Sequence, residues 1–419
     1  MLVLAAFLAA LLIALVVINF GSGERRVDRE IEHLYPVDDP QFDRAMALML
    51  GPTIVPGNRV QELANGDRIF PAMLEAIRGA RSTVLFETFI YWSGDIGTAF
   101  AEALSDRAAA GLKVHVLLDW VGSTRVDREL VRRMCDAGVQ VRMFHPLRWY
   151  NLGRMNDRTH RKLLIVDGRI GFTGGVGIAP QWCGDAQDPG HWRDMHFRVE
   201  GPVVAQMQSV MLSNWNKTTG RVLHGRDYFP ELAPAGGMAA QMFASSPSGG
   251  SESMLQMMLL AITAAVRSID IASAYFVPDE VALQSLRSAA ARGVRVRVIT
   301  PGPHTDQDTV RRASRGLWGP LLEAGVEMHE YQPTMYHCKM MIVDGLLTSV
   351  GSTNFDPRSF HLNDEANLNV YDGEFARRMT EVFEADLRRC QRVTLADWQR
   401  RPWPEKLRER ISAVLAPVL

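Results

Sequence analysis

The stretch that decides the fold is HCKMMIVD, residues 337–344, which is followed seven residues later by GSTN, residues 351–354. Its apolar centre is typical of a buried strand, and the two-residue period of a strand places His337 and Lys339 on one face. A histidine that titrates near neutral pH can attack phosphorus or transfer a proton. A neighbouring lysine supplies fixed positive charge to a phosphoryl oxygen. The stretch therefore predicts a phosphate site.

A second copy of the pattern occurs earlier in the chain, as HRKLLIVD at residues 160–167, followed by GGVG at residues 174–177. Phosphodiester chemistry needs two such groups, because one histidine attacks phosphorus while another protonates the leaving oxygen. A single His-x-Lys triplet is a weak signal, whereas two extended copies are a strong one. We therefore expect both halves of the chain to contribute to one site.

Lysine is rare in this chain, which makes its two motif positions informative. Of the 46 Lys and Arg residues only five are Lys, and two of these are Lys162 and Lys339. A compact ammonium contacts a phosphoryl oxygen differently from the planar fork of Arg. The alternative interpretation, two buried histidines on ordinary strands, leaves both lysines unexplained, since buried Lys is rare unless paired or functional.

Length and composition are typical of a globular protein with two or three domains. The chain has 419 residues, of which 47% are hydrophobic, and this is ample for sizeable cores. The formal net charge is −1, so nothing suggests the broad basic surface of a nucleic-acid-binding protein, and no nucleic-acid partner is expected. The four cysteines form no CxxC pair and are compatible with a reducing compartment.

We expect no metal ion and no cofactor. Cys183, Asp185, Asp188 and His191 lie close together in the sequence, but their spacing matches no zinc pattern. Chemistry carried by His and Lys also requires no metal. We therefore interpret this segment as a loop.

An apolar stretch opens the chain. Residues 1–20 are apolar except for Asn19, and about 20 such residues span a bilayer core as a helix. No Lys or Arg precedes the stretch and no good cleavage site follows it, which favours a membrane anchor over a signal peptide. Arg25, Arg26 and Arg29 follow it, so the positive-inside rule places the body on the cytoplasmic side of the inner membrane.

The rest of the chain predicts an α/β protein with two similar halves, because the same order of helices and strands occurs twice. Such halves imply mixed sheets flanked by helices, with the ligand where the halves meet. The expected segments are residues 1–20 (anchor), 21–56 (juxtamembrane segment), 57–227 (first half), 228–253 (connection, with one strand at 238–244), 254–392 (second half) and 393–419 (amphipathic tail).

The tail has two interpretations that the sequence leaves open. Aromatic and apolar residues interleave with basic ones, namely Arg400, Arg401, Lys406, Arg408 and Arg410. One interpretation is a helix that lies on an anionic membrane surface. The other is a helix that packs on the second half.

The pattern HxK, four residues, D, six residues and G-[GS]-x-N resembles the signature of the phospholipase D superfamily. In that superfamily two such motifs meet across a pseudo-two-fold axis and build one active site. From residue 57 onward the chain is similar to bacterial cardiolipin synthases, most specifically in DPRSF at 356–360 before NDE at 363–365. The resemblance implies transfer of a phosphatidyl group to a phospholipid headgroup hydroxyl, usually with phosphatidylglycerol on both sides, through a phosphohistidine.

The resemblance also implies roles for individual residues. The implied catalytic residues are His160, Lys162, Asp167, His337, Lys339 and Asp344, with His160 as nucleophile and His337 as acid and base by analogy. The implied phosphate-binding residues are Ser352, Asn354 and Gly175.

Each motif is followed by a carboxylate that suits a histidine-orienting role. Glu365 lies 28 residues after His337, and Asp194 lies at the corresponding place in the first half once an inserted loop is allowed for. An imidazole that presents one nitrogen to phosphorus needs an acceptor at its other nitrogen. The alternative for either residue is an ordinary surface carboxylate.

The first motif departs from the superfamily pattern, because Gly177 stands where the pattern has Asn. If only a donor was lost, Gly177→Asn should be neutral or mildly activating. If the glycine backbone contacts the substrate, the same change should be damaging. Two alternative functions remain beside phosphatidyl transfer. A hydrolytic phospholipase D, phosphodiesterase or nuclease would use the same residues and differ only in the acceptor, and a weakened lipid-binding protein is suggested by Gly177 alone.

Overall fold

The computed structural model describes residues 27, 29–147, 156–247 and 253–414. The apolar stretch at residues 1–20, which we expect to be an anchor, lies outside these residues. Within the described ranges, no helix is both long and apolar enough to cross a membrane.

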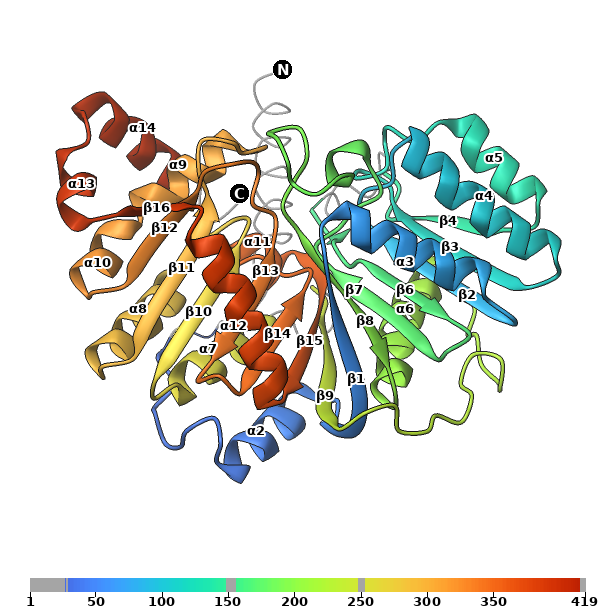
Figure 1. The fold of residues 1–419 in the computed structure, drawn as a ribbon, viewed down its shortest axis with the longest axis horizontal. Helices are drawn as coiled ribbons and strands as arrows, with labels where there is room; N and C mark the ends of the chain where they lie inside the picture. The colour runs from blue at the N-terminus through green and yellow to red at the C-terminus, as the bar shows by residue number, and fades with distance from the viewer. Residues whose placement is uncertain (1–26, 28, 148–155, 248–252, 415–419) are drawn as a thin grey trace, which may run out of the picture.

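The strands follow the same order in both halves of one mixed sheet (Figure 1). In the first half the order is β1 (Val55–Ala64), β8 (Met195–Glu200), β7 (Ile170–Gly174), β6 (Leu163–Val166), β2 (Thr83–Thr88), β3 (Lys113–Asp119) and β4 (Gln140–Phe144). In the second half it is β9 (Met238–Ser245), β15 (Asn363–Tyr371), β14 (Leu347–Gly351), β13 (Lys339–Val343), β10 (Ser268–Ser273), β11 (Arg295–Pro301), β12 (Glu327–Tyr331) and β16 (Cys390–Val393). Except for β16, each strand has a counterpart, so the halves are related by pseudo-two-fold symmetry.

The two halves join along β1 and β9, which pair in antiparallel register. The expected strand at 238–244 is β9, and its residues 239–245 also pair with β15. Each half has three parallel strands at its outer side, β2 to β4 in one and β10 to β12 in the other, and antiparallel strands toward the junction. This arrangement confirms the predicted mixed α/β architecture.

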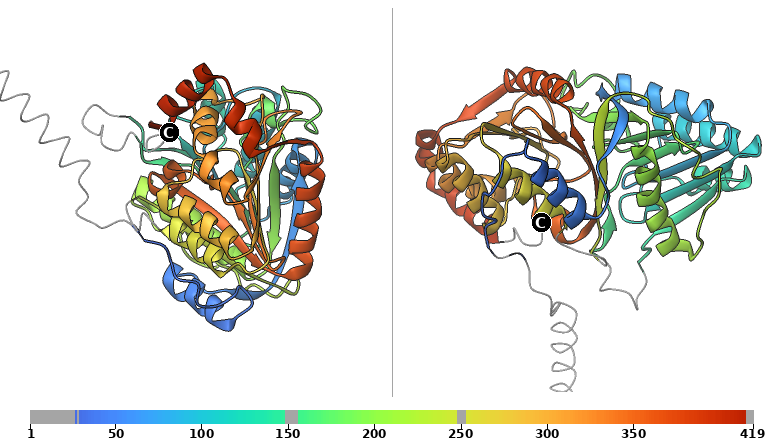
Figure 2. Two further views of the ribbon diagram at one scale, coloured as in Figure 1. Left: turned by 90° about the vertical axis from the view of Figure 1, so that its left-hand side faces the viewer. Right: turned by 90° about the horizontal axis from the view of Figure 1, so that it is seen from below.

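Helices cover both faces of the sheet (Figure 2). Those of the first half are α3 (Gly66–Arg78), α4 (Asp95–Ala109), α5 (Arg128–Asp136) and α6 (Val203–Thr219). Those of the second half are α7 (Ser253–Ala264), α8 (Glu280–Ala291), α9 (Asp308–Gly316), α10 (Trp318–Glu323), α11 (Pro357–His361) and α12 (Gly373–Leu387). Aspartates at the N-caps define where several of them begin: Asp279 accepts from the amide of Ala282 over 2.8 Å, and Asp372 accepts from the amide of Phe375 over 2.7 Å.

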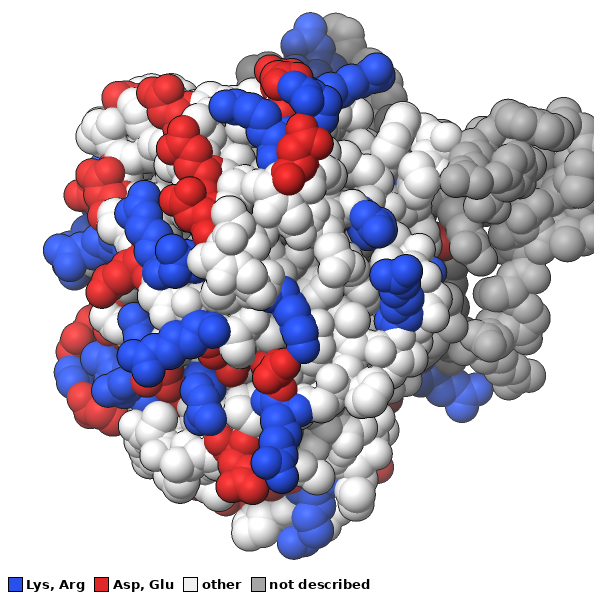
Figure 3. All heavy atoms as spheres, turned by 90° about the vertical axis from the view of Figure 1, so that its right-hand side faces the viewer, with Lys and Arg blue, Asp and Glu red and all other residues white. Residues whose placement is uncertain are grey.

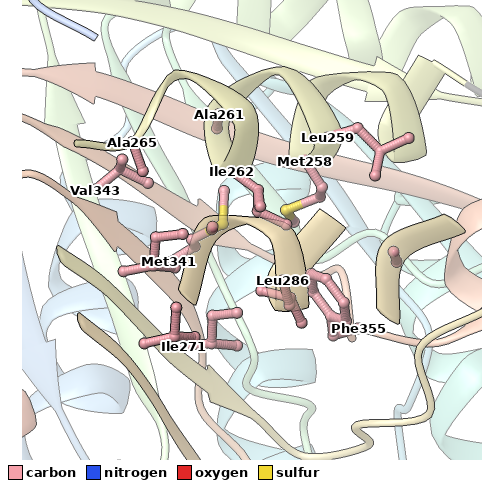
Figure 4. Packing of buried hydrophobic residues seen from close by; sticks show 14 of the residues in the cluster. Met258, Leu259, Ala261, Ile262, Ala265, Ile271, Leu286, Met341, Val343 and Phe355 are labelled. Atoms are coloured by element: carbon pink, nitrogen blue, oxygen red, sulfur yellow. The ribbon is translucent and has the colours of Figure 1, made fainter. Parts of the chain in front are cut away.

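The structure has three hydrophobic cores. One lies within each half, and Figure 4 shows the core of the second half, where Met258 and Ile262 of α7 pack against Ile271 and Met341 of the sheet. The third core contains residues of both halves: Phe197 of the first half packs in the same cluster as Leu368 and Met340 of the second. Burial of each large apolar side chain contributes about 1.5–3 kcal/mol. The shared core therefore fixes one half against the other, which a site built at their junction requires.

Segments outside the two halves add further elements. Within the expected juxtamembrane segment, α2 (Pro40–Leu50) packs its buried Phe42 and Met46 into the core of the second half. At the other end of the chain, the expected tail forms α13 (Leu395–Arg400) and α14 (Trp403–Val414), and α14 packs on α9.

The outer end of the first half, formed by α4 and α5, carries side chains of both charge signs interspersed over its surface (Figure 3). This face has no broad basic patch of the kind that nucleic-acid binding requires.

Candidate active site

Each histidine motif lies at the junction of the halves, and the opposite half holds its backbone. The short strand β5 (Arg158–Thr159), directly before His160, pairs with the start of β15. The amide of His160 donates to the carbonyl oxygen of Asp364 over 2.9 Å, and the amide of His337 donates to the carbonyl oxygen of Arg193 over 2.8 Å. These two equivalent contacts place both histidines beside the pseudo-two-fold axis.

Arg161 strengthens this junction, although the sequence gave no signal for it beyond its place in the motif. Its buried guanidinium donates to the carbonyl oxygens of Glu365 (3.2 Å), Val210 (3.0 Å) and Ser245 (3.0 Å). Arg161 therefore ties the first motif to both sides of the junction.

The orienting carboxylates are exchanged between the halves. Nδ1 of His160 lies 2.9 Å and 3.1 Å from the two carboxylate oxygens of Glu365. Nδ1 of His337 lies 2.7 Å from Oδ2 of Asp194. Both carboxylates are fully buried, so the alternative of ordinary surface carboxylates is wrong. Spacing along the chain groups each carboxylate with its own motif, but each one holds the histidine of the other half.

Burial keeps both histidines neutral in the free protein. It lowers the pKa of His160 to about 4 and that of His337 to about 3, because a charged imidazolium is disfavoured away from water. Burial alone raises the pKa of Asp194 and Glu365, but the nearby imidazoles and lysines outweigh it and lower the pKa of both carboxyls. Each pair is therefore a neutral imidazole that donates from Nδ1 to a carboxylate. Nε2 is left with a lone pair.

Nε2 is the atom of each imidazole that is available to a substrate. Among the residues that the structure describes, no hydrogen bond is formed by Nε2 of His160 or of His337. The two side chains keep 11% and 7% of their surface exposed, respectively. Both rings can therefore be reached from outside although they are largely buried.

The two motif lysines lie next to the histidines. Nζ of Lys162 donates to the carbonyl oxygen of His160 over 2.6 Å, and Nζ of Lys339 donates to that of His337 over 2.7 Å. Burial lowers the pKa of Lys162 to about 7 and also lowers the pKa of Lys339. Two ammonium groups in a site with little water carry the charge that a phosphodiester anion needs.

Ser352 and Gly175 lie against the carboxylates that hold the two histidines. The hydroxyl of Ser352 donates to Oε2 of Glu365 and accepts from the amide of Ala366 at 3.0 Å. Gly175 donates its amide to the carbonyl oxygen of Met195, and a Cβ at this glycine would collide with the carboxylate of Asp194. Both donors are engaged within the protein, and phosphate binding by these two residues stays a prediction.

Trp182 replaces the side chains that the first motif lacks, and sequence reasoning missed it. Its Nε1 donates to Oδ2 of Asp194 over 2.9 Å, which is the part that Ser352 plays for Glu365. Its ring fills the space beside Gly177, where a Cβ would lie 3.1 Å from Cζ3 of the indole. The only available signal was Gly177 itself, since a glycine where the pattern has Asn leaves room for a large neighbour.

Asn354 remains the candidate for a neutral phosphate ligand. It is 3% exposed, and its amide donates to the hydroxyl of Ser359 over 3.2 Å. Its side-chain oxygen is buried and has no hydrogen-bond partner among the described residues. This oxygen is an acceptor and does not contact a phosphate anion, so the prediction that Asn354 binds phosphate depends on the two donors of its side-chain NH2 group.

Asp167 and Asp344 do not lie among the reacting groups. Each follows its motif strand, so it stands seven residues from the motif histidine, which is roughly 20 Å along an extended chain. The carboxylate of Asp167 accepts from the backbone amides of residues 81–83, and that of Asp344 accepts from the amides of residues 266–268. The expectation of a catalytic role is therefore corrected: both aspartates anchor the start of a neighbouring strand.

The loop with four possible ligand residues contacts Asn65, which precedes α3, and also forms a contact within itself. Oδ1 of Asp185 accepts from the side chain of Asn65 over 2.8 Å, and Nδ1 of His191 lies 2.8 Å from Oδ1 of Asp188. In the described part of the chain, no group of three His, Cys, Asp or Glu side chains is arranged to hold a metal ion.

The fold and the site together define a class of protein. Two similar α/β halves, two His/Lys pairs at their junction and a carboxylate behind each histidine are the arrangement of a phospholipase D-type active site. A family model described as "Cardiolipin synthase, PLD-like domain" matches residues 73–188 and 258–387.

Relatives of known name agree with this class. The chain is 36% identical to a cardiolipin synthase of Geobacillus over 360 residues, which cover 85% of this chain and 72% of the relative. It is 35% identical to cardiolipin synthase A of Pseudomonas putida, with 90% of this chain and 78% of the relative covered. The chain therefore belongs to the cardiolipin synthase family, and it is a phosphatidyltransferase of the phospholipase D type.

Solved structures share the fold. A phosphatidylserine synthase from Haemophilus influenzae superposes with a TM-score of 0.66 over 90% of this chain and 100% of that chain, at 13% sequence identity. A polyphosphate kinase from Porphyromonas gingivalis superposes with a TM-score of 0.54 over 89% of this chain and 53% of that chain, also at 13% identity. At this identity the likeness concerns the fold alone.

We expect Trp182→Phe to lower kcat/KM about 10- to 100-fold, because it removes a hydrogen bond of about 1.5–3 kcal/mol to a charged group while keeping an aromatic ring. Steady-state kinetics on lipid vesicles measure this. Trp318→Phe is the matched control, since Trp318 is also buried and donates from Nε1, to the hydroxyl of Ser314 over 3.0 Å. Equal kcat/KM for the two variants would show that Asp194 does not need the indole.

Gly177→Asn is expected to damage the enzyme, so of the two outcomes considered above the neutral or mildly activating one is not expected. A Cβ at this position would lie 2.9 Å from Cβ of Ile90 as well as against Trp182. Steady-state kinetics measure kcat/KM of this variant. The double variant Gly177→Asn/Trp182→Ala should recover none of the lost kcat/KM, because the contact with Ile90 remains and the hydrogen bond from the indole to Asp194 is lost as well. A tolerated single Gly177→Asn variant would contradict this packing.

We expect binding of sulfate, used as an anion that stays charged, to weaken by about tenfold per pH unit above pH 7. The cause is the pKa of Lys162 at about 7: the ammonium is charged below that pH and is lost as pH rises through it. Calorimetry on wild-type protein and Lys162→Met measures this, and the variant should bind weakly at every pH. Lys113→Met, which changes an exposed lysine, should keep the wild-type profile.

Proposed function

We propose that this enzyme transfers a phosphatidyl group from one phosphatidylglycerol to the headgroup hydroxyl of another, forming cardiolipin and releasing glycerol. The observation that carries the proposal is the pair of neutral histidines, each held at Nδ1 by a buried carboxylate of the opposite half. The two rings are fixed independently, so they can perform two different steps on one phosphorus atom.

In the first step, Nε2 of His160 attacks the phosphorus of the donor lipid. The bond from phosphorus to the glycerol oxygen breaks, and a proton from Nε2 of His337 neutralises that oxygen as glycerol leaves. This requires a protonated His337. The phosphodiester anion, bound between two lysines, favours that state because a negative charge beside an imidazole raises its pKa.

In the second step, His337 takes the proton from the hydroxyl of the acceptor lipid. The acceptor oxygen attacks phosphorus, the bond from phosphorus to Nε2 of His160 breaks, and both histidines return to their starting states. Lys162 and Lys339 stabilise charge on the phosphoryl oxygens in both steps, and we assign Asn354 as an additional neutral donor. The order of the two histidines follows the analogy with the superfamily.

Membrane attachment forms part of the same proposal. Donor, acceptor and product are lipids of the bilayer, and residues 1–20 form an apolar stretch of bilayer length. We assign this stretch as an anchor in the inner membrane, with the catalytic body on the cytoplasmic side.

Incubation of the purified protein with phosphatidylglycerol vesicles tests the reaction, with products identified by mass spectrometry. Cardiolipin and glycerol in equal amounts are the expected products. Phosphatidic acid as the main product would show transfer to water, which is the hydrolytic alternative. No lipid product at all would favour a lipid-binding protein and would overturn the proposal.

A further inference from the structure

The helix α14 turns its small and charged side chains inward, against α9. Glu409 is 1% exposed, and its carboxylate accepts hydrogen bonds from Arg315 (3.1 Å) and from Arg401. The helices approach closely because Gly316 has no side chain: a Cβ there would lie 3.4 Å from Cβ of Ala413. The contact between the two helices is therefore made by ion pairs and small residues rather than by a large apolar face.

The large apolar side chains of α14 point outward. Trp403 is 74% exposed, Leu407 49% and Ile411 59%. Their spacing of four residues places all three within an arc of about 80° on the helix surface. No other helix within the described ranges exposes three large apolar side chains. This is the reverse of an ordinary surface helix, which buries its apolar face and exposes its polar one.

Basic residues border this apolar stripe on both sides. At 100° per residue, Lys406 and Arg410 lie on one flank of the stripe and Arg408 lies on the other. The two acidic residues of the helix, Glu405 and Glu409, instead pair with Arg315 of α9. The outward surface of α14 is therefore apolar in its middle and cationic at its edges.

This surface lies at the edge of the sheet that contains the active site. Lys339 pairs with Ser273 at the carboxyl end of β10, and β11 runs parallel to β10 and so ends at the same edge. The connection from β11 to α9 stays close to the site, because Asp306 within it accepts a hydrogen bond from Tyr275 over 2.6 Å. Figure 1 shows α9 and α14 along the upper edge of the molecule and α2 at the lower edge.

We propose that α14 docks on the surface of a phospholipid bilayer that contains anionic lipid. The stripe of Trp403, Leu407 and Ile411 enters the boundary between headgroups and acyl chains, and the flanking cations contact lipid phosphates. A second copy of this chain is a poorer occupant, because a symmetric contact through the stripe brings like charges together. The proposal rests on the proposed function, since a lipid substrate must reach the active-site edge from a bilayer.

Photocrosslinking of the full chain tests the docking without relying on activity. A benzophenone amino acid replaces Leu407 in one variant and Leu48 of α2, which is 82% exposed, in the control. Both are reconstituted in vesicles of phosphatidylcholine with about one-third phosphatidylglycerol, as an anionic surface. Lipid adducts at position 407 and few at position 48 are expected. Adducts between two protein chains at position 407, or equal lipid adducts at both positions, would overturn the proposal.

A second measurement separates docking from chemistry. The triple variant Trp403→Gln/Leu407→Gln/Ile411→Gln should lower turnover on these vesicles at least about tenfold, as expected when buried apolar area anchors a helix. Its turnover of soluble bis(p-nitrophenyl) phosphate should be unchanged. The control Leu48→Gln/Met49→Gln/Val266→Gln removes three other exposed apolar side chains and should act as wild type on both substrates. Equal losses on vesicles for both triple variants would contradict docking through α14.

The two tests fail in different ways. If wild-type protein turned over neither substrate, the proposed transferase chemistry would be wrong, and the lipid adducts at position 407 would still decide the docking. If transfer proceeds but the adducts are absent, the docking alone is wrong.

Discussion

His160→Ala and His337→Ala should each lower kcat by about 10⁴-fold or more, because each variant removes one of the two groups on which both steps depend. The double variant should be little worse than either single variant, since groups that act as a unit are not additive. Turnover of phosphatidylglycerol in vesicles measures all three.

The two variants should differ when the leaving group needs no proton. With a p-nitrophenyl phosphodiester, His337→Ala should still form the covalent intermediate, and His160→Ala should not. His224→Ala, an exposed histidine far along the chain from both motifs, is the control for handling and folding. Near-wild-type turnover in either active-site variant would mean that the histidines do not share one reaction.

Glu365→Gln and Asp194→Asn should each lower kcat/KM by about 10²- to 10⁴-fold, because a carboxamide neither stabilises a charged imidazole nor enforces its tautomer. The exchanged contacts predict which step each variant affects. Glu365→Gln should slow formation of the covalent intermediate, since Glu365 holds His160. Asp194→Asn should slow the steps that need His337, and a p-nitrophenyl leaving group should relieve the first of these.

If Glu365→Gln instead slowed the steps that need His337, and Asp194→Asn slowed formation of the covalent intermediate, each carboxylate would act on the histidine of its own half. Melting temperatures of both variants serve as controls, because removing charge from a buried pair can also destabilise the fold.

Periodicity and repetition along the chain were sufficient to predict the architecture. The two copies of the His/Lys motif, the alternation of helices and strands and the strand at β9 all rest on local patterns, which a sequence displays directly. The same patterns located His160, Lys162, His337 and Lys339, and the structure brings all four to the junction of the halves.

The exchange of carboxylates could not be predicted, because spacing along the chain does not say which half a side chain meets. Glu365 and Asp194 were correctly expected near a histidine, but the crossing arises from backbone contacts such as that of His160 with Asp364. Trp182 was missed for a related reason. Its role depends on the space beside Gly177, which only the packing shows.

The repeated pattern predicted a catalytic role for residues that instead stabilise the fold around each motif. The aspartates Asp167 and Asp344 belong to the repeated pattern, and their carboxylates are needed to hold backbone amides at the far end of the strand. Ser352 donates a hydrogen bond to Glu365, a contact that the repeated pattern does not reveal. A repeated pattern marks positions that the fold or the chemistry requires, and sequence alone does not separate these two requirements.

The most direct test of the proposed mechanism is a rapid-quench experiment with phosphatidylglycerol labelled at phosphorus, followed by mass spectrometry to locate the labelled side chain. The structure and the proposed function predict a phosphatidyl group on Nε2 of His160, formed before any cardiolipin appears and passed to unlabelled phosphatidylglycerol when that lipid is added. Label on His337 with none on His160, or cardiolipin formed without any covalent intermediate, would contradict the mechanism.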